Sequence, residues 1–244
     1  MASPETRHSP GCEPGKDFAA QRARMVEEQI RARGLSDPRV LAAMAGVPRE
    51  AFVPELTRAH AYDDQPLPIG NDQTISQPYI VAVMIAALQL KGAERVLEVG
   101  TGSGYAAAVL AGVAGEVISI ERLASLADRA RRTLSALGIH NVEVLHGDGS
   151  RGCPQRAPFA AIVVAAGGPQ VPDSLKAQLA IGGRLVMPVG ADQLGQKLVR
   201  ITRTSQTTYA TETLTDVRFV PLIGAEGWSA AVPHEAAPAR AEPT

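Results

Sequence analysis

A glycine-rich loop that directly follows an apolar stretch is the strongest chemical feature of this sequence. The stretch Arg95–Val99 leads into Gly100, and glycines recur at Gly102 and Gly104. Glycines at alternate positions let a backbone turn sharply and approach a ligand closely, since no Cβ stands in the way. A helix that follows presents free N–H groups to an anionic group. The loop therefore predicts a cofactor site, with an ordinary tight turn between strand and helix as the structural alternative.

Two classes of cofactor fit this loop. The segment Gly102–Ala107 matches the fingerprint G-x-G-x-x-G/A of dinucleotide-binding proteins, with Glu121 downstream as an acid for the ribose hydroxyls. Two other carboxylates favour S-adenosylmethionine. Glu98 lies two residues before the first glycine, where it can receive a cationic or donor group, whereas a pyrophosphate site would avoid a carboxylate. Asp148, in a Gly-Asp-Gly segment, can accept a hydrogen bond from an adenine amino group.

These carboxylates also have structural interpretations. Glu121 can form a surface ion pair with Arg122 or Arg129. Asp148 can direct a turn, because Asp-Gly is a strong turn dipeptide. The residues that we expect to contact the cofactor are Glu98, Gly100, Thr101, Gly102, Ser103, Gly104, Glu121, Arg122, Asp148 and Gly149.

The elements around the loop alternate between strands and helices. Strands that alternate with helices of about 10–15 residues are typical of a parallel, doubly wound α/β sheet, in which ligands bind outside the carboxyl ends of the strands. The last three segments alternate without helices between them and predict antiparallel strands. The predicted strands are 95–99, 117–120, 142–145, 159–165, 183–189, 197–202, 209–214 and 217–222, and the later helices are 123–137 and 172–179. The fold is therefore Rossmann-like.

A helical extension precedes this sheet. Apolar residues on one face predict a helix from Phe18 to beyond Ile30, with Gly34 as its terminator. Asp37-Pro38 is typical of a helix N-cap followed by the first helical residue. Prolines, glycine and polar residues predict a loop over 62–77, and Pro78 starts a helix through Leu88.

We expect a single folded domain over residues 18–228. Within it, 18–90 forms the helical segment and 91–228 the α/β core. Residues 1–17 and 229–244 carry too little apolar surface to offset the entropy of ordering them, and are predicted to be flexible tails.

Composition excludes several classes of protein. Of 244 residues, 45% are hydrophobic and 20% charged, as in an ordinary globular protein. Lys and Arg number 24 against 25 Asp and Glu, which argues against a strongly basic nucleic-acid binder. The two cysteines and five histidines show no metal-binding spacing, so we expect no metal. No apolar run approaches the ~18–20 residues of a membrane span, and the N-terminus lacks a secretory apolar region, which indicates a cytoplasmic protein without membrane contact.

At this point a family resemblance becomes clear, over about residues 24–228 and in the family's order and spacing. The sequence resembles protein-L-isoaspartate (D-aspartate) O-methyltransferases, and the Thr-Ile-Ser-Gln-Pro segment is the motif most specific to them. The matching motifs are Leu67-Pro68-Ile69-Gly70, Gln73-Thr74-Ile75-Ser76-Gln77-Pro78, Glu98-Val99-Gly100-Thr101-Gly102-Ser103-Gly104-Tyr105, Gly147-Asp148-Gly149, Ile181-Gly182-Gly183, Pro188-Val189-Gly190 and Phe219-Val220-Pro221-Leu222.

The resemblance implies the S-adenosylmethionine-dependent methyltransferase fold and a repair reaction. A methyl group passes from S-adenosylmethionine to the free α-carboxylate of an L-isoaspartyl residue, with D-aspartyl residues as a second substrate class. S-adenosylhomocysteine is the other product, and the ester then closes to a succinimide. The implied partners are damaged proteins and peptides, and nothing in the sequence requires more than a monomer.

Ser76 is the residue we expect at the reaction centre, because the matching serine is the functional one in the family. A serine before Gln-Pro at a helix start is also a capping arrangement. Thr74 and Gln77 are expected to line the substrate site. Ile69 and Val220 would flank the substrate peptide, with core packing as their structural interpretation.

Three residues depart from the family pattern. Asp72 stands where glycine is usual, and would add like charge near an anionic substrate and restrict the backbone. Ala160 replaces an acid, and Ala165 replaces a threonine near the substrate channel.

Other functions compete with repair. Asp72 favours a methyltransferase that acts on another carboxylate or a small molecule. A dinucleotide-dependent oxidoreductase is opposed by Glu98, and a non-enzymatic S-adenosylmethionine-binding protein would bind the cofactor without methylating anything.

Overall fold

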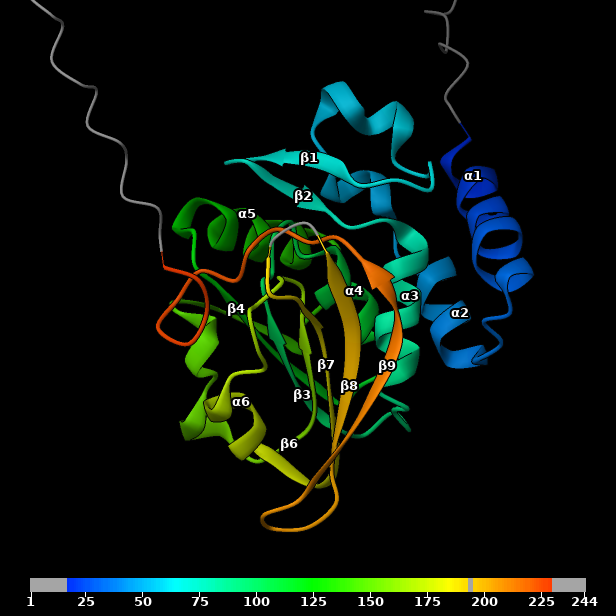
Figure 1. The fold of residues 1–244 in the computed structure, drawn as a ribbon. Helices are drawn as coiled ribbons and strands as arrows, with labels where there is room; N and C mark the ends of the chain where they lie inside the picture. Colours follow the sequence, from blue (N-terminus) through cyan, green and yellow to red (C-terminus); the bar gives the residue numbers. More distant parts are fainter. Residues whose placement is uncertain (1–16, 193–194, 230–244) are drawn as a thin grey trace, which may run out of the picture.

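The computed structural model describes residues 17–192 and 195–229. At its centre is a seven-stranded sheet with the order β5-β4-β3-β6-β7-β8-β9 (Figure 1). The first five strands in this order are parallel, and β8 and β9 run antiparallel beside β7. The strands are β3 Arg95–Val99, β4 Glu116–Glu121, β5 Val142–His146, β6 Phe159–Val164, β7 Leu179–Val189, β8 Gln196–Arg203 and β9 Tyr209–Val217. The predicted α/β fold with antiparallel C-terminal strands is confirmed.

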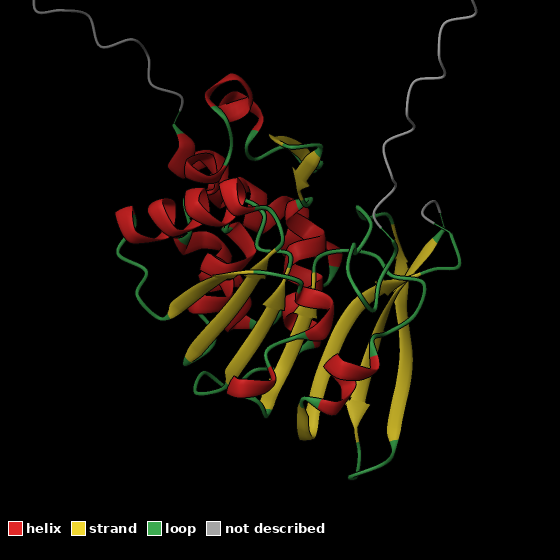
Figure 2. Cartoon of the chain, turned by 90° about the vertical axis from the view of Figure 1, so that its left-hand side faces the viewer, coloured by secondary structure: helices red, strands yellow, loops and turns green. Residues whose placement is uncertain are grey.

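The two faces of the sheet are covered unequally, as Figure 2 shows. Alternate strand residues point to opposite faces, so Val96 and Val163 join one core while Leu97 and Ile162 join the other. Most helices pack on the first face and α6 on the second. The helices are α1 Phe18–Arg24, α2 Pro38–Gly46, α3 Pro78–Ala87, α4 Tyr105–Ala111, α5 Ala124–Ala136 and α6 Asp173–Ala177.

The helical extension follows the local signals of the sequence. The first helix continues as a π-helical turn, Met25–Ile30, and a 3-10 turn, Arg31–Arg33. It ends at Gly34, whose φ of 91° is left-handed, as expected of a terminating glycine. The Asp37 side chain caps α2 by accepting hydrogen bonds from the first backbone N–H groups.

The sequence predicted a loop over residues 62–77, and this prediction is wrong for part of the segment. Strands β1 (Leu67–Gly70) and β2 (Gln73–Ile75) pair there as an antiparallel hairpin. Its two turn residues, Asn71 and Asp72, have φ values of 53° and 55°. Two successive left-handed residues make the tight turn whose twist suits a hairpin. The prolines and polar residues on which the loop prediction rested therefore mark a turn and its flanks.

Two predictions about the second half of the chain are also wrong. Residues 217–222 form no strand, because the chain leaves the sheet after Val217 and makes only an isolated bridge at Pro221. Helix α6 is five residues long, and Leu179, expected to be its last residue, begins β7 instead. Short apolar segments do not distinguish a strand from a buried extended loop.

The strand order places an opening beside β3. The chain passes from β3 to β4 and β5 on one side, and then returns to β6 on the other side of β3. At such a reversal, the loops that leave the two neighbouring strands diverge and leave a crevice. The β1–β2 hairpin lies beside this edge of the sheet (Figure 1).

The predicted tails, residues 1–17 and 229–244, lie outside the described residues apart from Asp17 and Ser229. The division into 18–90 and 91–228 stays a prediction. No helix within the described ranges is long and apolar enough to cross a membrane.

Candidate active site

Two adjoining cavities lie at the reversal point of the sheet. The first has a volume of about 830 Å³ when the space open to solvent is included. It lies between the glycine loop, the ends of the parallel strands, the hairpin and the segment after β9. Its lining residues are 73–76, Val81, 99–103, Tyr105, Ala106, 120–123, Gly149, Ala165, Ala166 and 220–223.

The second cavity opens on the far side of the hairpin, beside the end of β9. Its lining residues are Pro66, Thr74, Ser76, Gln77, Ile80, Ala165 and 216–220. Four residues line both cavities: Thr74, Ser76, Ala165 and Val220. The two cavities therefore adjoin at these residues, and Ser76 borders both of them.

The glycine loop forms the floor of the first cavity. Gly102 and Gly104 have φ values of 54° and 92°, which only glycine adopts without strain. A Cβ on Gly102 would also lie 3.3 Å from Cδ1 of Ile69 in the hairpin. The loop thus needs glycine both for its conformation and for its close contact with the hairpin.

Glu121 ends β4 and lines the first cavity. Its Oε2 accepts a hydrogen bond from Gly102 N at 2.8 Å, and its Oε1 accepts one from Leu123 N at 2.9 Å. Each oxygen keeps a second lone pair, so the carboxylate can still accept from two neighbouring hydroxyls. The alternative partner Arg129 is engaged elsewhere, because it donates to Ile69 O at 2.7 Å. The surface ion pair considered for Glu121 is not formed among the described residues.

Glu98 lies behind the wall of the cavity. Its side chain is completely buried and accepts a hydrogen bond from Ser119 Oγ, which in turn contacts Thr101 Oγ1. Burial raises the pKa of Glu98 to about 8, opposed by the Ser119 bond and assisted by the nearby charge of Glu121. Within the described part of the chain, Oε1 of Glu98 has no hydrogen-bond partner. Glu98 therefore reaches the cavity through Ser119 and Thr101, and its direct contact with a cofactor stays a prediction.

Asp148 directs a turn, as its structural interpretation proposed. Its Oδ1 accepts from Ser150 N and Oγ at 2.9 and 2.7 Å, and its Oδ2 accepts from Ala225 N at 2.8 Å. Burial alone would raise the pKa of Asp148, but the hydrogen bonds from Ala225 and Ser150 outweigh it and lower the pKa. Asp148 does not line the first cavity, whereas its neighbour Gly149 does.

Ser76 does not cap α3. The N-cap is Gln77, which makes no side-chain capping bond, and Pro78 is the first helical residue. The Ser76 carbonyl accepts from Nη2 of Arg49 at 2.8 Å, and its hydroxyl makes no hydrogen bond to a described residue. A hydroxyl without a protein partner at the junction of two cavities is available to a ligand.

The other predicted substrate residues divide into two groups. Thr74 and Val220 line both cavities and Gln77 lines the second, where Asp64 Oδ2 accepts from Gln77 Nε2 at 2.7 Å. Ile69 lines neither cavity and packs in the core against the glycine loop. Of the predicted cofactor residues, Gly104 also lies outside the lining.

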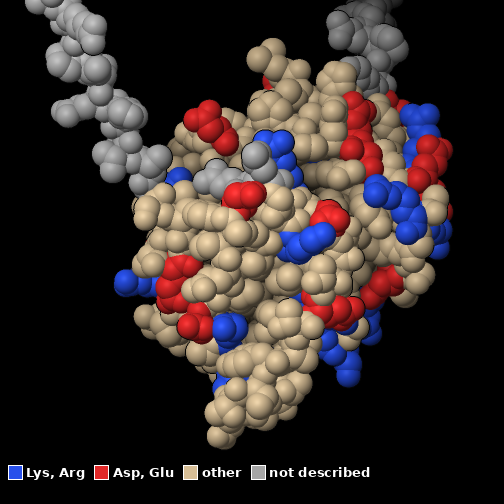
Figure 3. Space-filling view, in the orientation of Figure 1, with Lys and Arg blue, Asp and Glu red and all other residues tan. Residues whose placement is uncertain are grey.

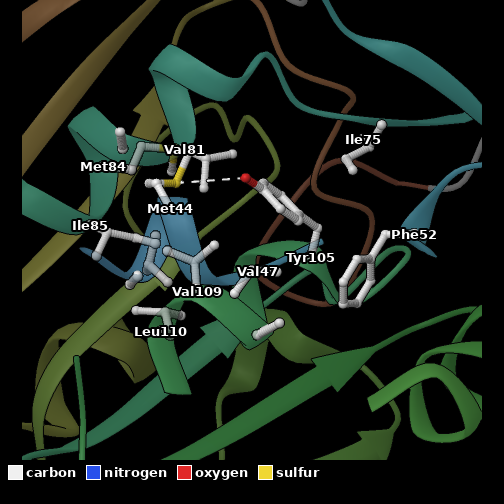
Figure 4. Packing of buried hydrophobic residues seen from close by; sticks show 14 of the residues in the cluster. Met44, Val47, Phe52, Ile75, Val81, Met84, Ile85, Tyr105, Val109 and Leu110 are labelled. Carbon is white, nitrogen blue, oxygen red and sulfur yellow. Dashed lines mark hydrogen bonds between the residues drawn. The ribbon is translucent and has the colours of Figure 1, made fainter. Parts of the chain in front are cut away.

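Two buried residues at the site, Tyr105 and Arg49, were not among the predicted site residues. Tyr105 lines the first cavity and its ring packs edge-on against Phe52, with centroids 5.7 Å apart. Figure 4 shows the Tyr105 hydroxyl pointing to Met44 Sδ, and Ile75 on the other side of the ring. Arg49 lies over the same ring at 4.7 Å. In the sequence Arg49 is followed by Glu50 within an apolar stretch, 40–54, and nothing there distinguishes Arg49 from a surface charge.

No group of three or more His, Cys, Asp or Glu side chains among the described residues is arranged to hold a metal ion. The arrangement instead suits a reaction between two organic ligands that meet at Ser76. The fold, the glycine loop and the carboxylate at the end of β4 together fit the Rossmann-like enzymes that bind a nucleotide cofactor, among them the methyltransferases that use S-adenosylmethionine.

Comparison with known proteins identifies the family. A family model described as protein-L-isoaspartate (D-aspartate) O-methyltransferase matches residues 20–227, and the chain belongs to this family. It is 67% identical over 96% of both chains to protein-L-isoaspartate O-methyltransferase 1 of Rhodopseudomonas palustris strain HaA2. A Pelobacter propionicus protein-L-isoaspartate O-methyltransferase 2 is 58% identical, over 84% of this chain and 91% of that protein.

Solved structures agree with this assignment. A protein-L-isoaspartate O-methyltransferase superposes with a TM-score of 0.78 and 29% identity, over 84% of this chain and 67% of the other. A Plasmodium falciparum protein assigned to the same group, in complex with S-adenosyl-L-homocysteine, gives 0.70 and 27%, over 83% and 98%. Family membership decides against the dinucleotide-dependent oxidoreductase.

Proposed function

We propose that this protein transfers the methyl group of S-adenosylmethionine to the free α-carboxylate of L-isoaspartyl residues in damaged proteins and peptides. The observation that carries the proposal is the meeting of two cavities at Ser76, Thr74, Ala165 and Val220. One cavity accommodates the methyl donor and the other the acceptor. Membership of the protein-L-isoaspartate O-methyltransferase family supports the choice of acceptor.

The residues of the first cavity fit S-adenosylmethionine. The glycine loop forms its floor, with Gly102 at a left-handed φ of 54°, and Glu121 presents free lone pairs suited to the ribose hydroxyls. The residues that would hold the cofactor are Gly100, Thr101, Gly102, Ser103, Glu121, Arg122 and Gly149. When bound, the cofactor supplies a methyl group made electrophilic by a sulfonium.

The protein's task in this reaction is mainly one of position. The acceptor carboxylate is already ionised at neutral pH, so no general base is required. In our proposal the Ser76 hydroxyl donates to one carboxylate oxygen and leaves the other directed at the methyl carbon. An oxygen–carbon bond forms as the carbon–sulfur bond breaks, which gives the methyl ester and S-adenosylhomocysteine. Holding the atoms in line at near-attack distance supplies much of the acceleration.

The low polarity of the junction assists the transfer. An anion and a cation react to give two neutral products, so charge is lost on the way to the transition state. Water stabilises separate charges more than neutral groups, and a site that excludes water therefore favours the transfer. Ala165 and Val220 contribute apolar surface at this position. The ester later closes to a succinimide, a step that needs no further residue of the protein.

The test compares two peptides that differ only in one L-isoaspartyl or normal aspartyl linkage. With labelled S-adenosylmethionine, we expect base-labile label on the isoaspartyl peptide alone. Ser76→Ala should lower kcat/KM by about 10- to 100-fold, since a hydrogen bond to a charged group is worth about 1.5–3 kcal/mol. Ser135→Ala, at an exposed serine of α5, is the matched control and should retain wild-type activity. Cofactor binding with label on neither peptide would refute the proposal.

A methyltransferase for another carboxylate or a small molecule is the second candidate. Its support was Asp72, which the structure places at the exposed turn of the hairpin and in the lining of neither cavity. The isoaspartyl substrate is therefore preferred.

We also propose that the enzyme acts in the cytoplasm as a monomer, extends to D-aspartyl residues, and binds neither nucleic acid nor membranes. The formal net charge of -1 supports the last point. Acidic and basic side chains also lie interspersed on the face seen in Figure 3, without a broad basic area.

A further inference from the structure

We propose that Arg49 is a positioning residue for the methyl transfer, because its buried guanidinium fixes the main chain that carries Ser76. The inference rests on the function proposed above. Arg49 belongs to a 3-10 helix, Arg49–Phe52, between α2 and the hairpin, and is fully buried. It lines neither cavity, so it acts through the residues it contacts.

One guanidinium joins the two ends of the segment 61–76. Nε of Arg49 donates to Ala61 O at 2.7 Å, and Nη2 donates to Ser76 O at 2.8 Å. The whole β1–β2 hairpin lies between these two carbonyls. The rigid, planar fork of an arginine holds two acceptors in a fixed relation, which a lysine cannot do.

Neither carbonyl belongs to a regular ladder. Ala61 follows the 3-10 helix Glu55–His60, and Ser76 precedes the N-cap of α3. Gln77 O accepts the first helical bond, from Val81 N, so the helix does not use Ser76 O. A buried carbonyl without a donor costs free energy, and Arg49 supplies that donor at both places.

The same arginine links Ser76 to the first cavity. Three residues make one turn of a 3-10 helix, so Arg49 and Phe52 lie on the same side. Both contact Tyr105: Arg49 over the ring at 4.7 Å, and Phe52 against its edge at 5.7 Å. Tyr105 lines the first cavity and directly follows the glycine loop. Arg49 thus sets Ser76 in a fixed relation to the wall of the cofactor site.

A contribution to folding stability does not by itself explain the buried charge of Arg49. Burial lowers the pKa of Arg49, while Tyr105, Tyr62 and Asp64 act in the opposite direction. Nη1 has no hydrogen-bond partner among the described residues. Buried charges can often be replaced by well-packed apolar groups without loss of stability. Burying Arg49 costs desolvation energy, and its hydrogen bonds go to the main chain at Ala61 and Ser76. We therefore assign it the role of holding Ser76 in position.

The test uses Arg49→Gln and Arg49→Lys in the full chain. Loss of the fork should displace Ser76, and misplacement by about 1 Å can cost about 100-fold in rate. We expect kcat for the isoaspartyl peptide to fall by about this factor in both variants, with KM for the peptide and the affinity for S-adenosylhomocysteine close to wild type. Arg49→Lys keeps the buried charge, so it provides a folded variant if the glutamine variant fails to fold.

The matched control is Gln29→Ala. Gln29 Nε2 donates to Tyr62 O at 2.8 Å, so it also supports this segment but contacts neither Ser76 nor Tyr105. The control should lower the melting temperature and leave kcat unchanged. A loss of melting temperature without loss of kcat in both Arg49 variants would show a merely structural role and overturn the inference.

Hydrogen exchange provides a readout that does not depend on turnover. Amide exchange over residues 73–77 should rise in the Arg49 variants relative to residues 95–104 of the same protein. Unchanged exchange at 73–77 would overturn the inference. If wild type methylates no isoaspartyl peptide, the proposed function fails, and the exchange result still decides whether Arg49 fixes the chain at Ser76.

Discussion

On the cofactor side of the site the main chain sets the shape, whereas on the substrate side buried side chains hold the chain in place. The glycine loop takes its form from left-handed glycines and from hydrogen bonds that its main chain donates. Gly102 N donates to the Glu121 carboxylate, and the N–H groups of residues 100 and 101 donate to Ile120 O at the end of β4. The segment 61–76 is held at Ser76 by Arg49, and Gln77 beside it bonds back to Asp64.

This difference teaches where substitutions act. A backbone-built site fails when a Cβ is added, and a site held by side chains fails when a distant side chain is removed. The predictions below test this contrast.

The largest effect is expected at Glu98, which forms a buried side-chain network with Ser119 and Thr101 on the cofactor side. Burial raises the pKa of Glu98 to about 8 in the folded protein, so the unfolded chain loses its proton at lower pH. The contribution of Glu98 to the free energy of unfolding is therefore fully present below the pKa of the unfolded chain. It is lost as the pH rises through the pKa of the folded protein. The free energy of unfolding should fall by about 3 kcal/mol between pH 5 and pH 8.

Denaturant titrations of wild type and Glu98→Gln at both pH values check this prediction. The glutamine cannot ionise, so its stability should depend much less on pH over this window. Equal pH dependence in the two proteins would mean that Glu98 is ionised throughout.

Gly102→Val tests the cofactor side through its backbone. The φ of 54° strains a β-branched residue, and the new Cβ would lie 3.3 Å from Ile69 Cδ1. Strain and displacement of the hairpin should together cost about 3 kcal/mol, or about 100-fold in affinity for S-adenosylhomocysteine. Calorimetric titration measures the affinity, with Gly138→Val at the end of α5 as control, since it shares a positive φ but lies away from both cavities. If Gly102→Val bound S-adenosylhomocysteine with wild-type affinity, the main chain of the glycine loop would not set the shape of the cofactor side.

Asp72→Gly should have the smallest effect. Asp72 has a left-handed φ of 55° at an exposed turn, and glycine relieves this strain at some cost in chain entropy. We expect a gain in stability of about 0.5 kcal/mol and an unchanged KM for the isoaspartyl peptide. A marked fall in KM would instead support the like-charge effect expected from the sequence.

Local patterns predicted much of the fold. Alternation of apolar strands with amphipathic helices identified the parallel sheet, and Gly34 and Asp37-Pro38 were read correctly as helix ends. The hairpin escaped detection because its turn uses Asn71 and Asp72 in a conformation more typical of glycine. The end of the chain was assigned to a strand because Phe219 to Leu222 are apolar, although they pack as an irregular wall of the cavities.

The candidate site was predicted in the same uneven way. The glycine loop and Glu121 follow from contiguous sequence, and Ser76 follows from a family motif. Arg49 and Tyr105 could not be assigned, since their importance lies in contacts across long sequence distances. The contact of Glu98 and Asp148 with a cofactor stays a prediction, and in the structure their side chains accept hydrogen bonds from Ser119 and from Ser150 and Ala225.

The second cavity reaches the exposed residues Asp216 and Arg218, and the half-buried Ser76 lines the part of it that adjoins the first cavity. A carboxylate enters such a cavity more easily from a flexible stretch of chain than from a rigid surface. Local unfolding of the target therefore becomes part of recognition, and the free energy of that unfolding adds to the apparent KM. An enzyme with this architecture would repair loops and frayed ends first and would leave damage within rigid cores untouched until those cores open.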